Sequence, residues 1–548
     1  MWAVLFFVMF FGLLASGMPI FLVLGACAAV LYLFSDQPLI GAAQVVIDSL
    51  NSSTLMSLPL FVMAAAFMRQ GGVAKALVDV CTAWIGGVRG SLGLVTVVSC
   101  TLFAAICGSS VATALAMGTI LLPAMLEKGY PRSFALGVIG ASGTIGIVIP
   151  PSLALILYGI VAEQSVPRLF LAGILPGLLQ AAAFFGWVWY TARRNNFPVE
   201  PPMPMAQRWK VTWRAVPALA VPAIVLFGIY GGIVTVTEAA AIAAAVSMFI
   251  SLVFYRGFHW TQSLSVIADA LKSAGTIMLI VATAIVFGHW MTDSGVPAQL
   301  VKWVVDHQFT TWEFLLAINV LLLVLGCFLE VVATLLLVLP VLAPALIPLG
   351  VDPVHFSIIF THNMEIALVH PPVGLNLYVL ATISTAPIGE VIRGILPFLI
   401  LLLIVLMIIT YWPPLTMWLP QLVKWVVEHQ FSTWEFLLAI NVLLLVLGCF
   451  LEVVATLLLV LPVLAPALIP LGVDPVHFSI IFTHNMEIAL VHPPVGLNLY
   501  VLATISTAPI GEVIRGILPF LILLLIVLMI ITYWPPLTMW LPQLIYGH

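Results

Sequence analysis

Long apolar stretches, separated by short polar segments, run through the whole sequence. No charged residue lies between Arg89 and Glu127, and none lies between Arg132 and Glu163. A helix needs about 20 such residues to cross a membrane, whereas the strands of membrane barrels alternate apolar and polar residues. The continuous stretches therefore predict membrane helices and exclude a barrel. The uncharged first 35 residues have no basic n-region, which favours a retained membrane segment over a cleaved signal.

Two apolar stretches of the first half do not have the pattern of a single uninterrupted membrane-spanning helix. Residues 90–126 are too long for one crossing and carry Gly108-Ser109-Ser110 near the middle, which favours a re-entrant hairpin. Residues 131–162 contain Gly143-Thr144-Ile145-Gly146 and Pro150-Pro151. Glycine and proline at these positions should unwind the helix at mid-depth.

The second half carries the same two features. A hairpin is predicted at 312–349 with its tip at Gly326–Glu330, and a helix at 353–384 breaks at His370–Asn376. The other predicted elements are an apolar stretch at 3–34, broken at Gly17-Met18-Pro19 into one tilted helix or two short ones, an amphipathic piece at 72–88, and spans near 54–69, 169–192, 215–233, 238–255, 274–292 and 394–417.

Two spacings relate the halves to each other. The Pro150-Pro151 break is followed by Leu157-Tyr158 and by Gly173-Ile174-Leu175-Pro176, and the second break is followed by the same motifs at Leu377 and Gly394. The distance from the first proline to the glycine is 23 residues in both halves. Two weakly similar halves, each with one broken hydrophobic segment, are typical of a secondary transporter built from internal repeats.

A second repeat is nearly exact and therefore much younger. Residues Val301–Leu422 recur as Val423–Leu544, and only Asp306/Glu428 and Thr310/Ser432 differ. Solenoid repeats drift in sequence, so this repeat indicates either a recent tandem duplication or an error in assembling the sequence. A transport domain needs one second-half hairpin and one second broken helix. The copy at 301–422 is synthesised first, so we expect it to dock. The later copy is expected to pack at the periphery, to compete in a swapped arrangement or to be absent from the natural protein, and the sequence alone does not say which copy is docked.

Composition confirms the class and excludes others. Of the 548 residues, 63% are hydrophobic and only 7% are charged, and the mean hydropathy is +1.24. So few charged residues cannot form the water-facing surface of a soluble enzyme, of a nucleic-acid-binding protein or of a large extramembrane domain, so these classes are excluded. The six cysteines form no C-x-x-C pair and read as small buried hydrophobes. The basic loop at 193–214 should face the cytoplasm.

The first candidate site combines the hairpin tip with the broken helix of the first half. Small hydroxyl residues at helix contacts often do no more than permit close packing. Their place at a hairpin midpoint, opposite a broken helix, favours instead a site of carbonyl and hydroxyl oxygens for Na+, beside helix N-termini that attract a carboxylate. Its predicted residues are Ser109, Ser110, Thr113, Gly143, Thr144, Gly146, Pro150 and Pro151.

The second candidate site is the corresponding place in the second half. Its predicted residues are Gly326, Glu330, Thr334, Asn363, Pro371, Pro372, Gly374 and Asn376, and Na+ is expected at Ser109, Ser110, Gly326 and Gly374 across the two sites. A buried amide such as Asn363 can also serve packing alone. Glu330, Glu365 and His370 are ionisable groups in apolar segments and so are functional candidates. His362 and Glu365 are too few for a metal site, and Thr235-x-x-Glu238 reads as a capping box.

Enzyme and motor motifs are missing from the sequence. There is no G-x-x-x-x-G-K-[ST] for ATP and no H-E-x-x-H. Gly108-x-Ser110 lacks the closing glycine of a hydrolase elbow. An intramembrane hydrolase and an ATP-driven permease subunit remain as rival classes.

The motifs together resemble one family. Gly108–Ala114, Gly143–Ser152, Thr235–Ala241, Asn363–Ile366 and Pro371–Leu377 closely resemble the large membrane subunit of tripartite ATP-independent periplasmic (TRAP) transporters, of the DctM type. The resemblance covers residues 1–422. It departs from the family at His370, where a threonine-like residue is expected, and in the entire later copy.

This resemblance implies a multi-pass permease of the bacterial inner membrane and not an enzyme. It implies Na+-coupled import of an organic acid, such as a C4-dicarboxylate, a sialic acid or a keto acid, with Na+ as coupling ion and no other cofactor. The implied partners are a small four-helix membrane subunit and a periplasmic solute-binding protein, with no nucleic acid. A related carrier that works without a binding protein is the alternative.

The implied fold is an all-α polytopic membrane protein with two inverted repeats and an elevator-type mechanism. Each repeat has a re-entrant hairpin and a broken helix. Its parts in this chain are a first half at 1–192, the basic loop at 193–214, a second half at 215–422 and the duplicate at 423–548.

Overall fold

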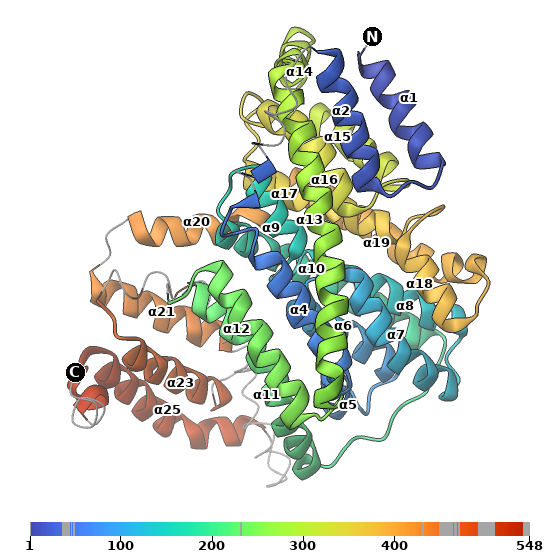
Figure 1. Ribbon diagram of the computed structural model, residues 1–548. Coiled ribbons are helices and arrows are strands. Elements are labelled where there is room, and N and C mark those ends of the chain that lie inside the picture. Colours follow the sequence, from blue (N-terminus) through green and yellow to red (C-terminus); the bar gives the residue numbers. More distant parts are fainter. Residues whose placement is uncertain are drawn as a thin grey trace. The chain divides into compact units, whose positions relative to one another are not determined.

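The computed structural model describes residues 2–35, 44, 46–47, 50–230, 233–428, 432–448, 464, 468, 472–491 and 510–540. These residues are helical apart from short connections and one isolated bridge between Arg89 and Val199 (Figure 1). Seven of the helices are long and apolar enough to cross a membrane, or eight if a pair bent by 64° forms one span. The protein is therefore an all-helical polytopic membrane protein, as the apolar stretches predict.

The chain divides into two compact units. The first comprises residues 1–225 and 234–420, and the second comprises 226–233 and 421–548. The second unit thus holds nearly all of the later copy of the duplication. The later copy's counterparts of the hairpin tip and the helix break, in 449–463 and 492–509, lie outside the described residues, as does Cys449.

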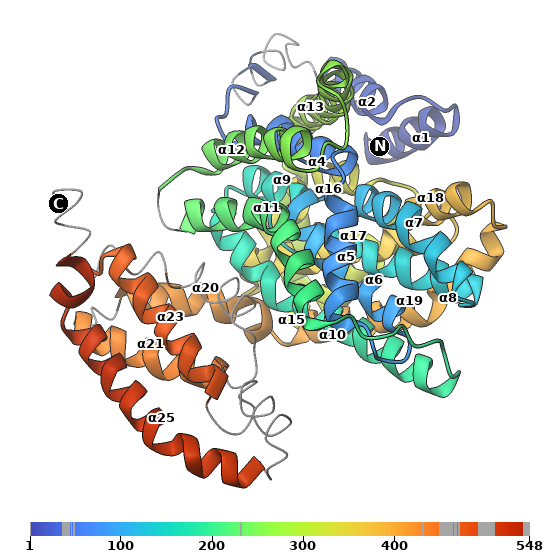
Figure 2. The same ribbon diagram turned by 90° about the horizontal axis from the view of Figure 1, so that it is seen from below.

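The first half of the chain contains both interrupted features. Its helices are α1 (Trp2–Ala15), α2 (Ile20–Phe34), α4 (Ser57–Gln70), α5 (Val73–Ile85), α6 (Ser91–Cys107), α7 (Ser110–Glu127), α8 (Arg132–Thr144), α9 (Leu153–Val161) and α10 (Val166–Arg194). The N-terminal stretch is thus two helices, separated at Gly17-Met18-Pro19. The bent pair is α4 and α5. Figures 1 and 2 both show α6, α7 and α8 side by side.

The second half repeats the hairpin and the broken helix. Its helices are α11 (Met205–Tyr230), α12 (Val236–Phe249), α13 (Ser263–Asp293), α14 (Val296–Asp306), α15 (Thr311–Gly326), α16 (Val331–Leu346), α17 (Pro353–Val369), α18 (Leu375–Ser384), α19 (Ile388–Tyr411) and α20 (Pro414–Glu428). A π-helical turn at Ile250–Phe254 extends α12. The later copy contributes α21 (Thr433–Gly448), α23 (Pro475–Val491) and α25 (Ile510–Tyr533).

One sequence expectation differs from the structure. The basic segment 193–214 is not a continuous loop, because Arg193 and Arg194 end α10, and Arg208, Lys210 and Arg214 lie inside α11. Only residues 195–204 connect the two helices. Long basic side chains bury their stems along a helix and keep their charges in a polar layer, so they do not require a loop.

Two smaller expectations concern caps and cysteines. The Thr235 hydroxyl accepts a hydrogen bond from the N–H of Glu238, and the N–H of Thr235 donates to the Glu238 carboxylate at 2.8 Å, which confirms the capping box. Of the cysteines in the described residues, Cys27, Cys81, Cys100 and Cys107 are buried, whereas Cys327 is partly exposed at the second hairpin tip.

Candidate functional site

The first hairpin tip is the two-residue connection between α6 and α7. Gly108 has a φ of +61°, and a Cβ at this position would lie 2.5 Å from the carbonyl oxygen of Pro151. The tip therefore contacts the backbone of the broken helix, and only glycine allows both the conformation and the approach. Ser109 caps α7, because its hydroxyl accepts from the N–H of Ala112, and the Thr113 hydroxyl donates to the Ser109 carbonyl at 2.8 Å.

The first break separates α8 from α9. After Thr144 the chain passes through a 3-10 turn at Ile145–Ile147 and the cis Pro150–Pro151 bond, and α9 starts when Ser152 caps it. A Cβ on Gly146 would lie 3.0–3.1 Å from backbone atoms of Ser109 and Ser110. A Cβ on Gly143 would lie 2.9 Å from the Ala114 side chain. The structure thus places Gly146 of the break against Ser109 and Ser110 of the tip, and residues 145–152 are buried.

Helix ends determine the chemistry of this site. The carboxyl ends of α6 and α8 lie beside the amino ends of α7 and α9. Free carbonyl oxygens at the first pair of ends attract a cation, whereas free N–H groups at the second pair attract an anion. The two interruptions therefore provide backbone oxygens for a cation and backbone N–H groups for an anion, and neither requires a charged side chain.

The second tip and break repeat the arrangement. Gly326 ends α15, and a Cβ there would lie 2.4 Å from the Cβ of Ala367 in α17. A Cβ on Gly374, which precedes α18, would lie 2.7 Å from the Leu368 carbonyl oxygen. The Thr334 hydroxyl donates to the carbonyl of Glu330, the residue before α16, at 3.0 Å. This contact matches that of Thr113 with the residue before α7, so the two tips are built alike.

The two sites differ in exposure. Residues of the first break are buried, whereas in the cis Pro371–Pro372 break Pro372 is exposed and the Val373 side chain is 49% exposed. The Sγ of Cys327 lies 3.5 Å from Nδ1 of His370, so these two side chains fill the space beside the second tip. Glu330 is exposed in this chain and makes no side-chain cap. The second break is thus the more exposed of the two, although Gly374 and Asn376 beside it are buried.

One hydrogen bond joins the two sites. The Asn376 amide nitrogen, in the first turn of α18, donates to the Ser110 hydroxyl at 2.9 Å, and both side chains are buried. The Asn376 carbonyl oxygen Oδ1 has no hydrogen-bond partner among the described residues. A buried acceptor without a partner is costly, which makes Oδ1 a ready ligand for a cation or a donor group.

Two predicted residues serve other contacts. Asn363 donates to Oδ1 of Asn319 at 2.7 Å, and Asn319 donates to the Thr410 hydroxyl at 3.0 Å, so Asn363 joins α17 to α15 and, through Asn319, to α19. The Thr144 hydroxyl accepts from Nε2 of Gln180 in α10 at 3.1 Å. The amide nitrogen of Asn363 thus serves helix packing, while its Oδ1, like that of Asn376, has no hydrogen-bond partner among the described residues, and Thr144 lies beside the first break.

Gln180 and Ser152 are residues that the sequence reasoning missed. Gln180 is fully buried and Ser152 caps α9 at the break. A signal for Gln180 was present, because it is the one amide in the apolar span 169–192. No group of three or more histidine, cysteine, aspartate or glutamate residues that could hold a metal occurs in the part of the chain that the structure describes.

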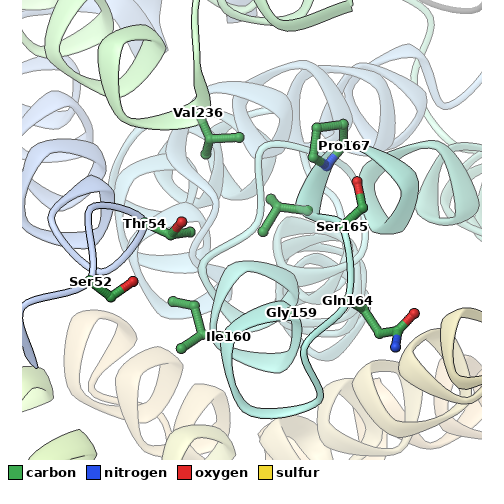
Figure 3. A pocket seen from close by; sticks show the side chains of 9 residues that line it. Ser52, Thr54, Gly159, Ile160, Gln164, Ser165, Pro167 and Val236 are labelled. Carbon is green, nitrogen blue, oxygen red and sulfur yellow. The ribbon is translucent and has the colours of Figure 1, made fainter. Parts of the chain in front are cut away.

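A cavity of about 300 Å³ lies apart from these tips (Figure 3). Its walls come from the segment before α4, the α9–α10 connection and the start of α12. The lining residues are Ser52, Thr54, Gly159, Ile160, Gln164, Ser165, Val166, Pro167 and Val236. None of them is charged, and none belongs to the predicted sites.

Comparison with known proteins gives a consistent result. The sequence matches the family described as "Tripartite ATP-independent periplasmic transporter, DctM component" over residues 7–415 and again over 416–537. It is 38% identical over 394 residues to the C4-dicarboxylate TRAP transporter large permease protein DctM of Pseudomonas aeruginosa, covering 72% of this chain and 92% of that protein. It is 36% identical to the isethionate TRAP transporter permease protein DctMQ of Oleidesulfovibrio alaskensis, covering 74% of this chain and 64% of that protein.

A solved structure shares the fold. The YdaH transporter of Alcanivorax borkumensis superposes with a TM-score of 0.50 at 16% identity, covering 70% of this chain and 88% of that one.

Proposed function

Because the chain belongs to the DctM-component family of tripartite ATP-independent periplasmic transporters, we propose that it imports an organic acid together with Na+. It is a multi-pass protein of the bacterial inner membrane. The contact between Asn376 and Ser110 carries the proposal, because it joins the broken helix of one half to the hairpin tip of the other. An ion bound at either tip would therefore affect the geometry of both.

The donors present suit Na+. A hard cation prefers several oxygen ligands, and backbone carbonyls with hydroxyl groups provide them without a fixed charge. Gly326 ends α15, where the last carbonyl oxygens of the helix are left without helical partners, and Ser109 and Ser110 add hydroxyl oxygens at the first tip. Oδ1 of Asn376 adds one further oxygen.

The anionic substrate is supported by the helix N-termini. The amino ends of α7, α9, α16 and α18 all begin at a tip or a break. N-terminal N–H groups bind carboxylates and related anions. The two relatives named above are described as transporting a C4-dicarboxylate and isethionate, which are both anions. The substrate of this chain is therefore proposed to be a small organic acid.

Partners follow from the family's tripartite description. We propose that a small membrane subunit and a periplasmic solute-binding protein complete the transporter. The hairpins and broken helices would then move as one body against the other helices, in an elevator mechanism. A carrier that needs no binding protein remains the second candidate, and leaving that protein out of the assay separates the two.

Uptake by the reconstituted complex tests Na+ coupling. Replacing Na+ with choline at constant membrane potential should abolish uptake, and Ser109→Ala should raise the Na+ concentration needed for half-maximal uptake. Ser99→Ala is the matched control, because its hydroxyl donates to the Val95 carbonyl at 2.6 Å two turns from the tip. Undiminished uptake with a proton gradient alone would refute Na+ coupling.

A further inference from the structure

The end of α10 and the start of α11 carry cations that have no acidic partner. Residues 193–214 contain one acidic residue, Glu200, and its carboxylate pairs with Lys128 at 3.1 Å. Among the described residues, no carboxylate lies within ion-pair distance of the other charged side chains of this segment. We call these five cations the basic patch: Arg193, Arg194, Arg208, Lys210 and Arg214.

The charges around the patch differ from those at the other end of α10. There, Arg168 lies 3.4 Å from the Asp352 carboxylate, so that cation is balanced within the chain. Near the patch, Asp79 on α5 interacts at longer range with both Lys75 and Arg214, so one acid is shared by two cations. The positive charge of the patch is therefore available to an anion outside the chain.

The two helix ends that carry the patch are held against one turn, residues 86–90, which joins α5 to α6. The N–H of Gly87 donates to the carbonyl of Glu200 at 2.9 Å, which fixes the connection between α10 and α11. A Cβ on Gly90 would lie 2.2 Å from the Cβ of Ala192, so the last turn of α10 contacts the same residues. The patch is thus one surface, although its cations come from two helices.

Arg208 is oriented by its surroundings. Its Nε donates to the carbonyl of Met203 at 2.8 Å, and its guanidinium carbon lies 6.0 Å from the centre of the Trp84 ring. Trp84 in turn donates to the Thr212 hydroxyl at 2.9 Å, where α5 and α11 lie side by side (Figures 1 and 2). The two Nη groups of Arg208 make no hydrogen bond to the described residues. A guanidinium with both Nη groups available can bind a phosphate through two parallel hydrogen bonds.

Exposed aromatic side chains show the depth at which the patch lies. The guanidinium of Arg193 stacks over the Trp189 ring at 4.0 Å, and Arg194 donates to the Tyr190 hydroxyl at 3.4 Å. Tryptophan and tyrosine are enriched at the headgroup level of a bilayer. The aromatic residues of the surface, all exposed, are Trp189, Tyr190, Trp209 and Trp213. The cations therefore lie at the level of the lipid phosphates.

We propose that the basic patch binds the headgroup of an anionic phospholipid, such as phosphatidylglycerol. The phosphate supplies the negative charge that the chain lacks, and the exposed rings contact the glycerol and the upper part of the acyl chains. A bound lipid joins the end of the first half to the start of the second, because the patch includes both. This inference goes beyond the proposed function and does not depend on it.

Native mass spectrometry of the full chain in detergent tests the proposal, with phosphatidylglycerol and phosphatidylcholine of the same acyl chains as probes. Wild type should bind phosphatidylglycerol about tenfold or more tightly than phosphatidylcholine. R193Q/R208Q should lose this preference to within about twofold. The control K272Q/K302Q removes the same charge from two exposed cations outside the patch, of which Lys272 already pairs with Asp269, and should keep the preference.

Thermal unfolding gives a second measurement. Phosphatidylglycerol should raise the midpoint for wild type and for the control but not for R193Q/R208Q, and high salt should remove the shift. If R193Q/R208Q does not fold, K210Q/R214Q, which changes two exposed side chains of the same patch, carries the same prediction.

Three results would overturn the lipid site. Equal binding of the two lipids by wild type would leave the patch to an acidic segment of a protein. Equal loss of preference in the control would show an effect of net charge alone. Equally tight binding of soluble glycerol phosphate would assign the patch to free phosphates. Uptake enters none of these measurements, so a failure of the proposed function leaves the test intact.

Discussion

The two copies of the duplicated segment have almost the same sequence but different surroundings. Within each copy the hydrogen bonds agree closely. Asn319 donates to Thr410 at 3.0 Å in the first copy, and Asn441 donates to Thr532 at 2.9 Å in the later one. The histidine that starts the broken helix lies 2.7 Å from a threonine hydroxyl in both, in the pairs His355–Thr416 and His477–Thr538. Contacts inside a copy are therefore encoded by that copy.

Burial differs between the copies. Ser357 and Thr361 on α17 are fully buried, whereas their counterparts Ser479 and Thr483 on α23 are exposed. The first copy also packs against helices of the first half, because α17 and α19 contact α8 and α10. The greater burial of the first copy thus accompanies its packing against the first half, whereas the later copy has a hydrophobic core of its own around Phe436, Leu444 and Phe478. Four predictions test this difference, from the largest expected effect to the smallest.

Gly394 and Gly516 should respond to alanine with opposite signs. A Cβ on Gly394 would lie 1.9 Å from the Ser133 carbonyl oxygen, and backbone atoms cannot yield without separating α8 from α19. Gly394→Ala should therefore lower the free energy of unfolding by about 2 kcal/mol or more. A Cβ on Gly516 would meet nothing within 4 Å, so Gly516→Ala should be neutral or gain up to about 1 kcal/mol in helix propensity.

Tryptophan fluorescence during thermal unfolding in detergent measures both glycine variants. Equal losses of stability in the two would show that the later copy is packed in the same way as the first.

Asn376→Ala should reduce uptake by about tenfold or more, since it leaves the buried Ser110 hydroxyl without its donor. The counterpart Asn498 lies outside the described residues, and Asn498→Ala should leave uptake unchanged. Initial uptake rates of the reconstituted complex give the comparison. The opposite order of effects would assign the working site to the later copy.

Asp352→Asn should have a small effect. Arg168 lies 3.4 Å from the Asp352 carboxylate, and both side chains are more than a third exposed, so the pair is worth at most about 1 kcal/mol. Asparagine keeps the cap that Asp352 provides to the N–H of Val354. Asp474→Asn, which changes the equivalent cap at the N–H of Val476, is the control. The difference in thermal stability between the two variants should vanish in high salt, and a difference that persists would contradict a screened surface pair.

Ending the chain after Leu422 should leave uptake unchanged. Deleting 301–422 instead joins Val423 to Leu300 and yields nearly the same sequence, with Glu428 and Ser432 as the changed positions. Both chains should transport, because each has one second-half hairpin and one broken helix ready to dock. Stable insertion of the shortened protein without uptake would mean that the later copy is required.

Much of the site was predictable because its signals are local. Glycine and proline at Gly108, Gly146 and the two Pro-Pro pairs interrupt helices wherever they stand in an apolar run. The Thr235–Glu238 capping box needs only four residues. The roles of Asn363 and Gln180 were not predictable. The local sequence around an amide in an apolar helix does not show whether the side chain contacts a packing residue or a residue at a break.

The sequence by itself determined that this is a helical membrane protein with two hairpins and two broken helices, since hydropathy and backbone propensity act within a few turns. The tertiary structure decided which copy is buried, that Asn376 meets Ser110 across 266 positions, and that the first break is buried while the second is more exposed. Near-identical copies have the same local propensities, so only the partner surface that one of them covers can distinguish them.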